Sequence, residues 1–197
     1  MSFFAHFRMH EGHQFRLDTR IYLRDSDKPG ERDTCVAAII GKNPGSANPT
    51  QFNRLTQLSL DGDKLLPNVR NRFRAAYERS GSQIPRGAYI RVWNLLYLCN
   101  PDLKDAIASF TTVRRPLICD TEQTMPRMVW FAWGPPNPKL SEYMSRFLDR
   151  AIDCPFYYDI DAKKVVTSKP TLTSKVKHTQ GLPMEPVERH LSRIVGR

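Results

Sequence analysis

The stretch VAAIIGKNPG at residues 36–45 decides the fold, because it joins an apolar strand to an abrupt polar ending. Its first five residues predict a buried β-strand, and the Gly-Lys-Asn-Pro-Gly that follows predicts a tight loop. Gly41 and Gly45 permit close backbone approach, and Pro44 fixes its own φ. The amide of Asn43 both donates and accepts hydrogen bonds. A polar loop at the carboxyl end of a strand is typical of the ligand sites of open α/β sheets.

Segments with the period of strands alternate along the chain with segments of helical period. In residues 15–24 apolar and polar side chains alternate, which predicts a half-buried edge strand with Arg16, Asp18 and Arg20 on a charged outer face. Further strands are expected at residues 35–40, 88–93, 128–133 and 156–158. Helices are expected from residue 68 to 81, near residue 101, from 138 to 151, and around 187–194.

This alternation predicts an α/β fold in a single domain that spans residues 1–197. We expect three layers, α/β/α, around a central and mostly parallel four-stranded sheet. Residues 1–34 are expected to form an N-terminal extension that carries the edge strand. A chain of 197 residues is long enough to bury a core without disulfides or metal.

The charge of the chain points to a polyanionic partner. Thirty Lys and Arg residues against 20 Asp and Glu residues give a formal net charge of +10. The positive charge thickens in the C-terminal third, where Lys175 and Lys177 precede His178. Such a surface is typical of proteins that bind nucleic acid through its phosphates, although the same charge spread evenly would carry no such meaning.

The cysteines and histidines give no pattern of a metal or redox centre. The four cysteines are scattered without a C-x-x-C pair, so we expect reduced thiols. His6, His10 and His13 are read as part of a mobile polar N-terminus. We expect no metal and no cofactor. No apolar run approaches the roughly 20 residues of a membrane span, and no secretory signal is recognisable, so the expected location is the cytoplasm.

Four motifs, in this order, resemble those of the uracil-DNA glycosylase superfamily. GKNPG at 41–45 is similar to the GINPG of the mismatch-specific and thymine-DNA glycosylases and to the GQDPYH of the uracil-specific branch. VWNLL at 92–96 resembles the LLLNTVL strand whose Asn reads the flipped base, and VWFAWG at 129–134 resembles VVFLLWG. KPTLTS at 169–174 stands where the superfamily has HPSPLS or NPSGLS.

A related bacterial family of unknown function matches several of the same positions. Its members read LNPSTA, DPTIRR, VVNLFAYRATDP, AWG and HPLY in order. Here NPGSA at 43–47, PNVRN at 67–71 and AWG at 132–134 occupy three of those slots. The resemblance therefore implies a fold like that of uracil-DNA glycosylase for most of the chain after residue 35.

The resemblance also implies an activity, the excision of a flipped pyrimidine base from DNA by hydrolysis of its N-glycosidic bond. Asn43 would orient the attacking water, and Asn94 would read the edge of the base. Lys169, or His178 if the fourth motif is shifted, would stabilise the negative charge on the departing base. The loop residues around Asn43, with Phe52 stacking on the extruded base, would complete the base pocket: Gly41, Lys42, Pro44, Gly45 and Phe52.

The resemblance implies a DNA-contacting loop in the C-terminal third. Leu172 would fill the gap that the flipped nucleotide leaves, and its neighbours would contact the strand. The expected DNA-binding residues are Pro170, Thr171, Leu172, Thr173, Ser174, Lys175 and Lys177. The expected partner is DNA, duplex or single-stranded, and the expected state is a monomer.

Each of these residues also fits a structural or non-catalytic role. Asn43 also fits a strand-terminating turn, Asn94 a capping residue, and Lys169 a simple phosphate contact. The whole chain also fits a nucleic-acid-binding module that has lost the chemistry, or a protein that processes free nucleosides or nucleotides. The base itself stays open among uracil, a mismatched pyrimidine and a modified cytosine.

Overall fold

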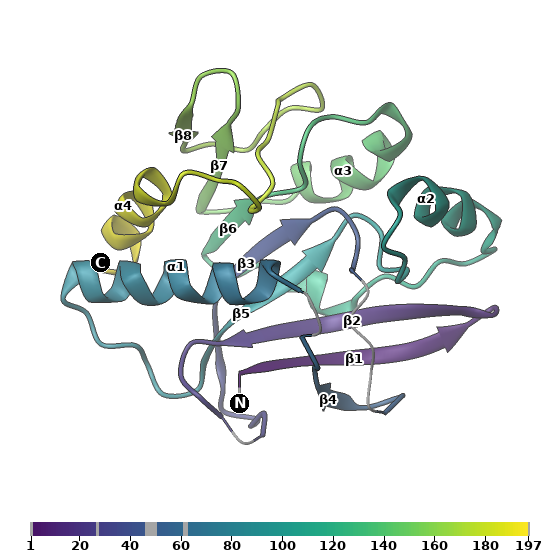
Figure 1. The fold of residues 1–197 in the computed structure, drawn as a ribbon, viewed down its shortest axis with the longest axis horizontal. Helices are drawn as coiled ribbons and strands as arrows, with labels where there is room; N and C mark the ends of the chain where they lie inside the picture. The colour runs from purple at the N-terminus through teal and green to yellow at the C-terminus, as the bar shows by residue number, and fades with distance from the viewer. Residues whose placement is uncertain (1, 27, 46–50, 61–62, 197) are drawn as a thin grey trace.

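A computed structural model describes residues 2–26, 28–45, 51–60 and 63–196 of the chain. Its eight strands form one sheet in the order β4-β1-β2-β5-β3-β6-β7-β8 (Figure 1). The strands are β1 (Phe3–His10), β2 (His13–Tyr22), β3 (Thr34–Gly41), β4 (Leu55–Gln57), β5 (Ala88–Asn94), β6 (Met128–Phe131), β7 (Cys154–Asp159) and β8 (Lys164–Val166). The α-helices are α1 (Leu65–Ser80), α2 (Leu103–Thr112), α3 (Ser141–Leu148) and α4 (Met184–Val195).

The sheet is mixed, and it is larger than the sequence predicted. β5, β3, β6 and β7 pair in parallel, whereas the other four pairings, β4 with β1, β1 with β2, β2 with β5, and β7 with β8, are antiparallel. The prediction of an α/β fold is confirmed. The prediction of a sheet with only four, mostly parallel strands is wrong, because the N-terminal strands and two short strands extend the same sheet at both edges.

The N-terminal residues form two strands of this sheet, β1 and β2. β1 and β2 form an antiparallel hairpin whose ends, His10 and His13, pair with each other. The intervening Glu11 and Gly12 have φ values of 47° and 78°, and two positive φ values at the centre of a two-residue loop match the twist of a hairpin. β2 therefore lies between β1 and β5, so the expectation of a mobile terminus followed by an edge strand is wrong.

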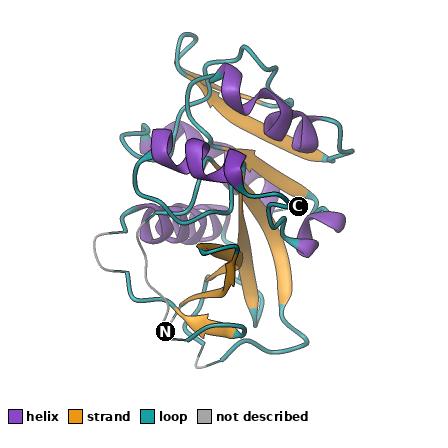
Figure 2. Ribbon diagram, turned by 90° about the vertical axis from the view of Figure 1, so that its right-hand side faces the viewer, coloured by secondary structure: helices purple, strands orange, loops and turns teal. Residues whose placement is uncertain are grey.

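Helices lie on both faces of the sheet (Figure 2), and a hydrophobic core fills the space between the sheet and the helices on each face. In β3, Ala37 and Ile39 face the core shared with α1 and α4, whereas Ala38 and Ile40 face the core shared with α2 and α3. This alternation is the period-2 geometry of a strand that is buried on both sides. The strand expected from residue 35 is thus confirmed as the inner strand that carries the GKNPG loop.

Helix α1 shows why its sequence folds as it does. Its buried side chains recur three and four positions apart and form one stripe that is apolar except for Arg72: Leu66, Val69, Arg72, Phe73, Ala76 and Tyr77. The helix ends where Gly81 adopts a left-handed φ of 68°, as expected from the sequence. α4 lies against α1 on the same face of the sheet (Figure 1). The residues at the start of α1 lie beside those that follow β3 and end β5, since both groups line one pocket.

Among the described residues, no helix is long and apolar enough to cross a membrane. The four cysteines are free thiols. Within the same residues, no group of three or more His, Cys, Asp or Glu side chains is arranged to hold a metal ion.

Candidate active site

A pocket of about 500 Å³ opens where the carboxyl ends of β3 and β5 meet the start of α1. A volume of this size suits a small organic ligand such as a nucleobase or nucleotide. Its wall is made by segments far apart in the sequence: Arg16, Asn43, Gly45, Asp63, Lys64, Leu65, Val92, Asn94, Pro101, His178 and Gln180. Four of the residues singled out from the sequence, Asn43, Gly45, Asn94 and His178, therefore meet in one cavity.

Asn43 is held in one orientation by the backbone around it. Its Nδ2 donates hydrogen bonds to the carbonyl of Asn100, at 2.7 Å, and to that of Pro44, at 3.3 Å. Because the amide nitrogen is committed to two carbonyl acceptors, Oδ1 is the atom that remains to accept a hydrogen bond from a ligand or a water molecule. Asn43 therefore lines the pocket with an amide whose orientation these two hydrogen bonds fix.

Asn94 ends β5 and is only 3% exposed. Its Nδ2 has no hydrogen-bond partner within the described part of the chain. A buried amide donor without a partner costs free energy, and a ligand in the pocket would supply the missing acceptor. Its Oδ1 approaches the backbone of Gly41 so closely that a Cβ at Gly41 would lie 2.8 Å from it. Gly41 therefore makes room for the Asn94 side chain and does not itself line the pocket.

His178 reaches the pocket from the loop between β8 and α4. Its Nδ1 accepts a hydrogen bond of 3.2 Å from the backbone N–H of Gln180. Burial lowers the pKa of His178, and the positive charges of Lys42 and Lys177 lower it further, against an opposing effect of Asp63. His178 is therefore neutral at pH 7, and its proton resides on Nε2. The imidazole offers the pocket a neutral N–H donor.

Lys42 and His178 both lie close to Gly134. Burial lowers the pKa of Lys42. Its Nζ is 3.3 Å from the place that a Cβ would occupy on Gly134, whose φ is 84°, and His178 flanks the same glycine. Lys42 is thus near the end of β6 and contributes positive charge next to His178 without lining the pocket.

Three charged residues of the pocket wall, Arg16, Asp63 and Lys64, were not predicted as site residues from the sequence. Arg16, expected on an exposed face of β2, is only 3% exposed, and its Nη1 lies 3.9 Å from Oδ2 of Asp63. The expected alternation breaks at Asp18, which has a φ of 43°, and β1 and β5 flank β2 on both sides. Asp63 accepts from the backbone N–H groups of Leu65 and Leu66 at the start of α1. A pattern read within one strand carries no signal of these contacts.

Lys169 does not reach the pocket. Its Nζ donates to the backbone carbonyls of Leu148 and Arg150 at the end of α3. Cations stabilise the carbonyl end of a helix in this way. Of the two alternatives left open for the group that faces the departing base, the pocket contains His178 and not Lys169.

The other residues expected to contact DNA lie on the surface loop after β8. Thr171, Thr173 and Ser174 hydrogen-bond to one another, Pro170 is buried, and Leu172 is 40% exposed. The exposed Lys175 forms an ion pair of 3.1 Å with Asp161. Lys177 lies beside His178 and is partly buried.

Phe52, the expected stacking residue, is 44% exposed, and neither it nor Pro44 is among the described residues that line the pocket. Ser46 and Ala47, which carry part of the resemblance, lie outside the described residues.

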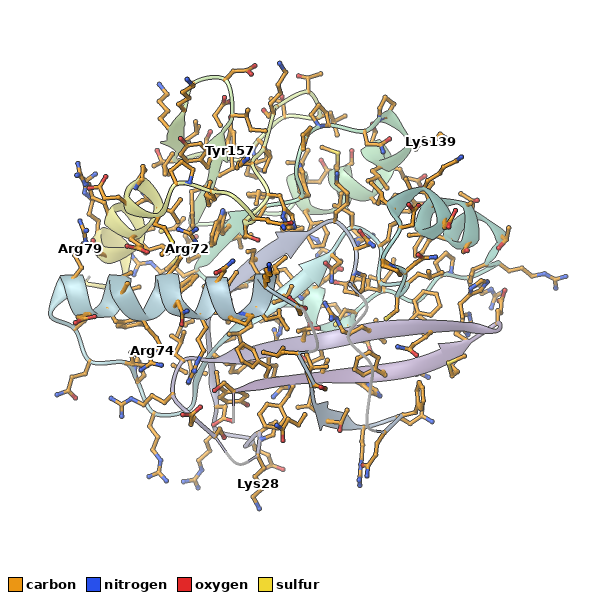
Figure 3. All side chains as sticks on the ribbon, in the orientation of Figure 1. Lys28, Arg72, Arg74, Arg79, Lys139 and Tyr157 are labelled. Carbon is orange, nitrogen blue, oxygen red and sulfur yellow. The ribbon has the colours of Figure 1, made fainter. Side chains whose placement is uncertain are left out.

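Positive charge is not confined to the C-terminal third of the chain. Lys28, Arg79 and Lys139 come from a loop, from α1 and from the segment before α3, and they project from different sides of the molecule (Figure 3). The described residues therefore carry positive charge on several sides of the molecule, and these three cations do not form a single basic stripe.

A buried polar network fixes the backbone beneath Asn94. Arg146 of α3 donates to the carbonyls of Asn94, at 3.0 Å, and Leu95, at 3.3 Å, and forms an ion pair of 2.8 Å with Glu122. Tyr97 donates its hydroxyl to the same carboxylate. Burial raises the pKa of Glu122, while the charge of Arg146 opposes that shift. The network holds the end of β5 in place from the face of the sheet opposite α1.

Comparison with protein-family models, with curated proteins and with solved structures found no match to this chain.

Proposed function

We propose that this protein is a DNA glycosylase that hydrolyses the N-glycosidic bond of a flipped pyrimidine, with uracil as the first base to test. The observation that carries the proposal is the convergence of Asn43, Asn94 and His178 on one pocket at the carboxyl ends of β3 and β5. Each of the three side chains offers the pocket a group suited to one task in base excision.

The three tasks follow from the chemistry of the bond. Its cleavage passes through a sugar cation while negative charge grows on the leaving base. Oδ1 of Asn43 accepts a hydrogen bond from the attacking water and orients it toward C1′ of the sugar. The amide of Asn94 reads the edge of the base. Nε2–H of the neutral His178 donates to the base oxygen on which the charge develops, and the nearby charge of Lys42 favours that anion.

Asn43 is a weaker proton acceptor than an aspartate. The proposal therefore includes slow chemistry, in which the enzyme positions the water and stabilises the leaving group but provides no strong general base. The parallel pairing of β5, β3, β6 and β7 and the helices on both faces also fit the fold of the uracil-DNA glycosylase superfamily, and this agreement supports the proposal.

The test uses single- and double-stranded oligonucleotides that each carry one candidate base, followed by alkali to cut abasic sites. We expect a cut product from at least one of the uracil, mismatched thymine and modified cytosine substrates. Asn43→Ala should lower the single-turnover rate by about a hundredfold or more at nearly unchanged DNA affinity, because it removes the orientation of the water. Asn71→Ala, an exposed position on α1, is the matched control and should leave the rate unchanged.

Asn94→Asp separates base reading from a structural role, because it replaces an amide donor by an acceptor. We expect the ratio of rates across the panel of bases to change more than the DNA affinity. Salt-sensitive DNA binding without any base release would favour a binding module that has lost the chemistry. Neither binding nor release would favour a protein that acts on free nucleosides or nucleotides.

A further inference from the structure

Arg16 is a buried cation whose hydrogen-bonding groups are largely unused. Its side chain is 4% exposed, and Nε and Nη1 have no hydrogen-bond partner within the described residues. Within the described residues its nearest carboxylate oxygen, Oδ2 of Asp63, lies 3.9 Å from Nη1, which is beyond hydrogen-bond distance. A buried guanidinium with such weak compensation lowers the stability of the folded chain unless another group satisfies it.

Asp63 is also occupied elsewhere. Its Oδ1 accepts from the backbone N–H of Leu65, at 2.8 Å, and of Leu66, at 3.3 Å, and thereby caps α1. This capping holds the carboxylate at the helix end and leaves the guanidinium without a paired, fork-like contact. Within the described residues, Arg16 therefore carries more hydrogen-bond donors than its neighbours satisfy.

The buried side-chain atoms left without a partner in the residues that line the pocket share one chemical character. Nε and Nη1 of Arg16 and Nδ2 of Asn94 are all N–H donors within the described residues. Lys64 adds a second cation to the same wall, and Asp63 adds a carboxylate. His178 contributes a further N–H. A ligand that satisfies this set must bring acceptors, and it must bring negative charge to the part that faces Arg16.

We propose that Arg16 anchors an oxyanion that the ligand carries into the pocket, through paired hydrogen bonds from its guanidinium to two oxygens of a carboxylate or a phosphate. The planar fork of arginine suits both groups, which are its preferred bidentate partners. The assignment deepens the proposed function and rests on it only in taking the ligand to be a nucleotide. The oxyanion has two sources in such a ligand: a carboxylate on the base or the 5′-phosphate.

Calorimetry with three defined probes distinguishes the sources: uridine, uridine 5′-monophosphate and 5-carboxyuridine. We expect the wild-type protein to bind one of the two anionic probes at least about tenfold more tightly than uridine, the effect of one charge-assisted contact. A gain with 5-carboxyuridine alone identifies a base carboxylate, and a gain with the monophosphate alone identifies the phosphate. Equal affinity for all three probes overturns the proposal.

Arg16→Met tests whether the gain belongs to this residue, with Arg86→Met, an exposed arginine outside the pocket wall, as the matched control. Arg16→Met should remove the preference for the anion, and Arg86→Met should keep it. Thermal denaturation without ligand provides a second measurement. Because the variant no longer buries an undersatisfied charge, we expect Arg16→Met to unfold at a temperature no lower than the wild-type protein.

Arg16→Lys keeps the inference testable if the methionine variant does not fold. It retains the charge but loses the planar fork, so the preference for the anion should be smaller than in the wild-type protein. An undiminished preference in either variant overturns the proposal.

An assay of base release distinguishes a failure of the anion site from a failure of the proposed glycosylase function. Release by a wild-type protein that shows no preference for anions refutes the anion site alone. An Arg16-dependent preference without release of any base refutes the glycosylase alone.

Discussion

The backbone N–H of Gln180 donates to Nδ1 of His178 over 3.2 Å, and both residues line the pocket. This contact selects the tautomer of a neutral imidazole, since only an unprotonated Nδ1 can accept it. A protonated ring would set two N–H groups against each other at this point. The contact and the lowered pKa of His178 therefore act in the same direction, toward a neutral side chain with its hydrogen on Nε2.

The first prediction concerns pH. The pKa of His178 is lowered below the usual 6.5, so as pH falls the unfolded chain takes up a proton before the folded one does. The free energy of unfolding should therefore decrease from pH 6.5 down to the folded pKa, and base release should decrease once His178 becomes protonated. Melting temperatures and single-turnover rates from neutral pH to about pH 5 measure both effects.

His178→Gln should remove the part of the pH dependence of unfolding free energy that comes from His178, and it should reduce the rate of base release. His190 in α4 is the matched control, because burial lowers its pKa too but it lies outside the pocket wall. His190→Gln should change the stability profile and leave base release intact. A rate that rises as His178 becomes protonated would show that the residue acts as a cation.

The second prediction concerns the close approach of Gly41 to Asn94. A Cβ at Gly41 would lie 2.8 Å from Oδ1 of Asn94, whereas a Cβ at Gly45 would meet nothing within 4 Å among the described atoms. Gly41→Ala should therefore displace Asn94, lower the free energy of unfolding by about 1–3 kcal/mol, and weaken discrimination between bases. Gly45→Ala should stay within about 0.5 kcal/mol of the wild-type protein. Urea denaturation and the base panel measure both; equal effects of the two variants would refute the crowding at Gly41.

The third prediction concerns the buried pair under β5. Arg146→Met leaves the carboxylate of Glu122 without its cation and should lower the free energy of unfolding by about 3 kcal/mol. The double variant Arg146→Met with Glu122→Gln removes both charges and keeps an acceptor for Tyr97, so it should be more stable than the single variant. Chemical denaturation of the two variants decides the point. A double variant less stable than Arg146→Met would show that charge pairing is not what stabilises this network.

The fourth prediction separates Lys169 from the chemistry. Because its Nζ binds two carbonyls at the end of α3, Lys169→Ala should lower the melting temperature slightly and leave the single-turnover rate at saturating DNA unchanged. Lys175→Ala is the control variant for stability and rate. Lys175 is exposed and, among its described contacts, is paired only with Asp161, so this variant should also leave the single-turnover rate unchanged. A large loss of rate in Lys169→Ala but not in Lys175→Ala would show that Lys169 takes part in catalysis.

Local sequence patterns determined the elements that contain the pocket. The apolar run of β3 followed by GKNPG and the strand that ends in Asn94 are confirmed. The helical stripe of α1 with its glycine stop is also confirmed, although the helix begins at Leu65 and not at the predicted residue 68. These features depend on contacts within one strand or one helix, or on the period of burial along it. Such information is local, and for that reason the sequence predicts it.

Only the tertiary structure decided which of these elements meet. The hairpin of β1 and β2 joins the sheet at β5. The fold places the Arg16 side chain beside Asp63 at the start of α1, where it is buried, although alternation alone had placed it on an exposed face. The loop after β8 brings His178 into the pocket and leaves Lys169 at the end of α3. Strand order and loop path depend on contacts between residues far apart in the chain. A periodicity within one segment contains no information on them, because burial of a side chain is set by the neighbours that the fold places around it.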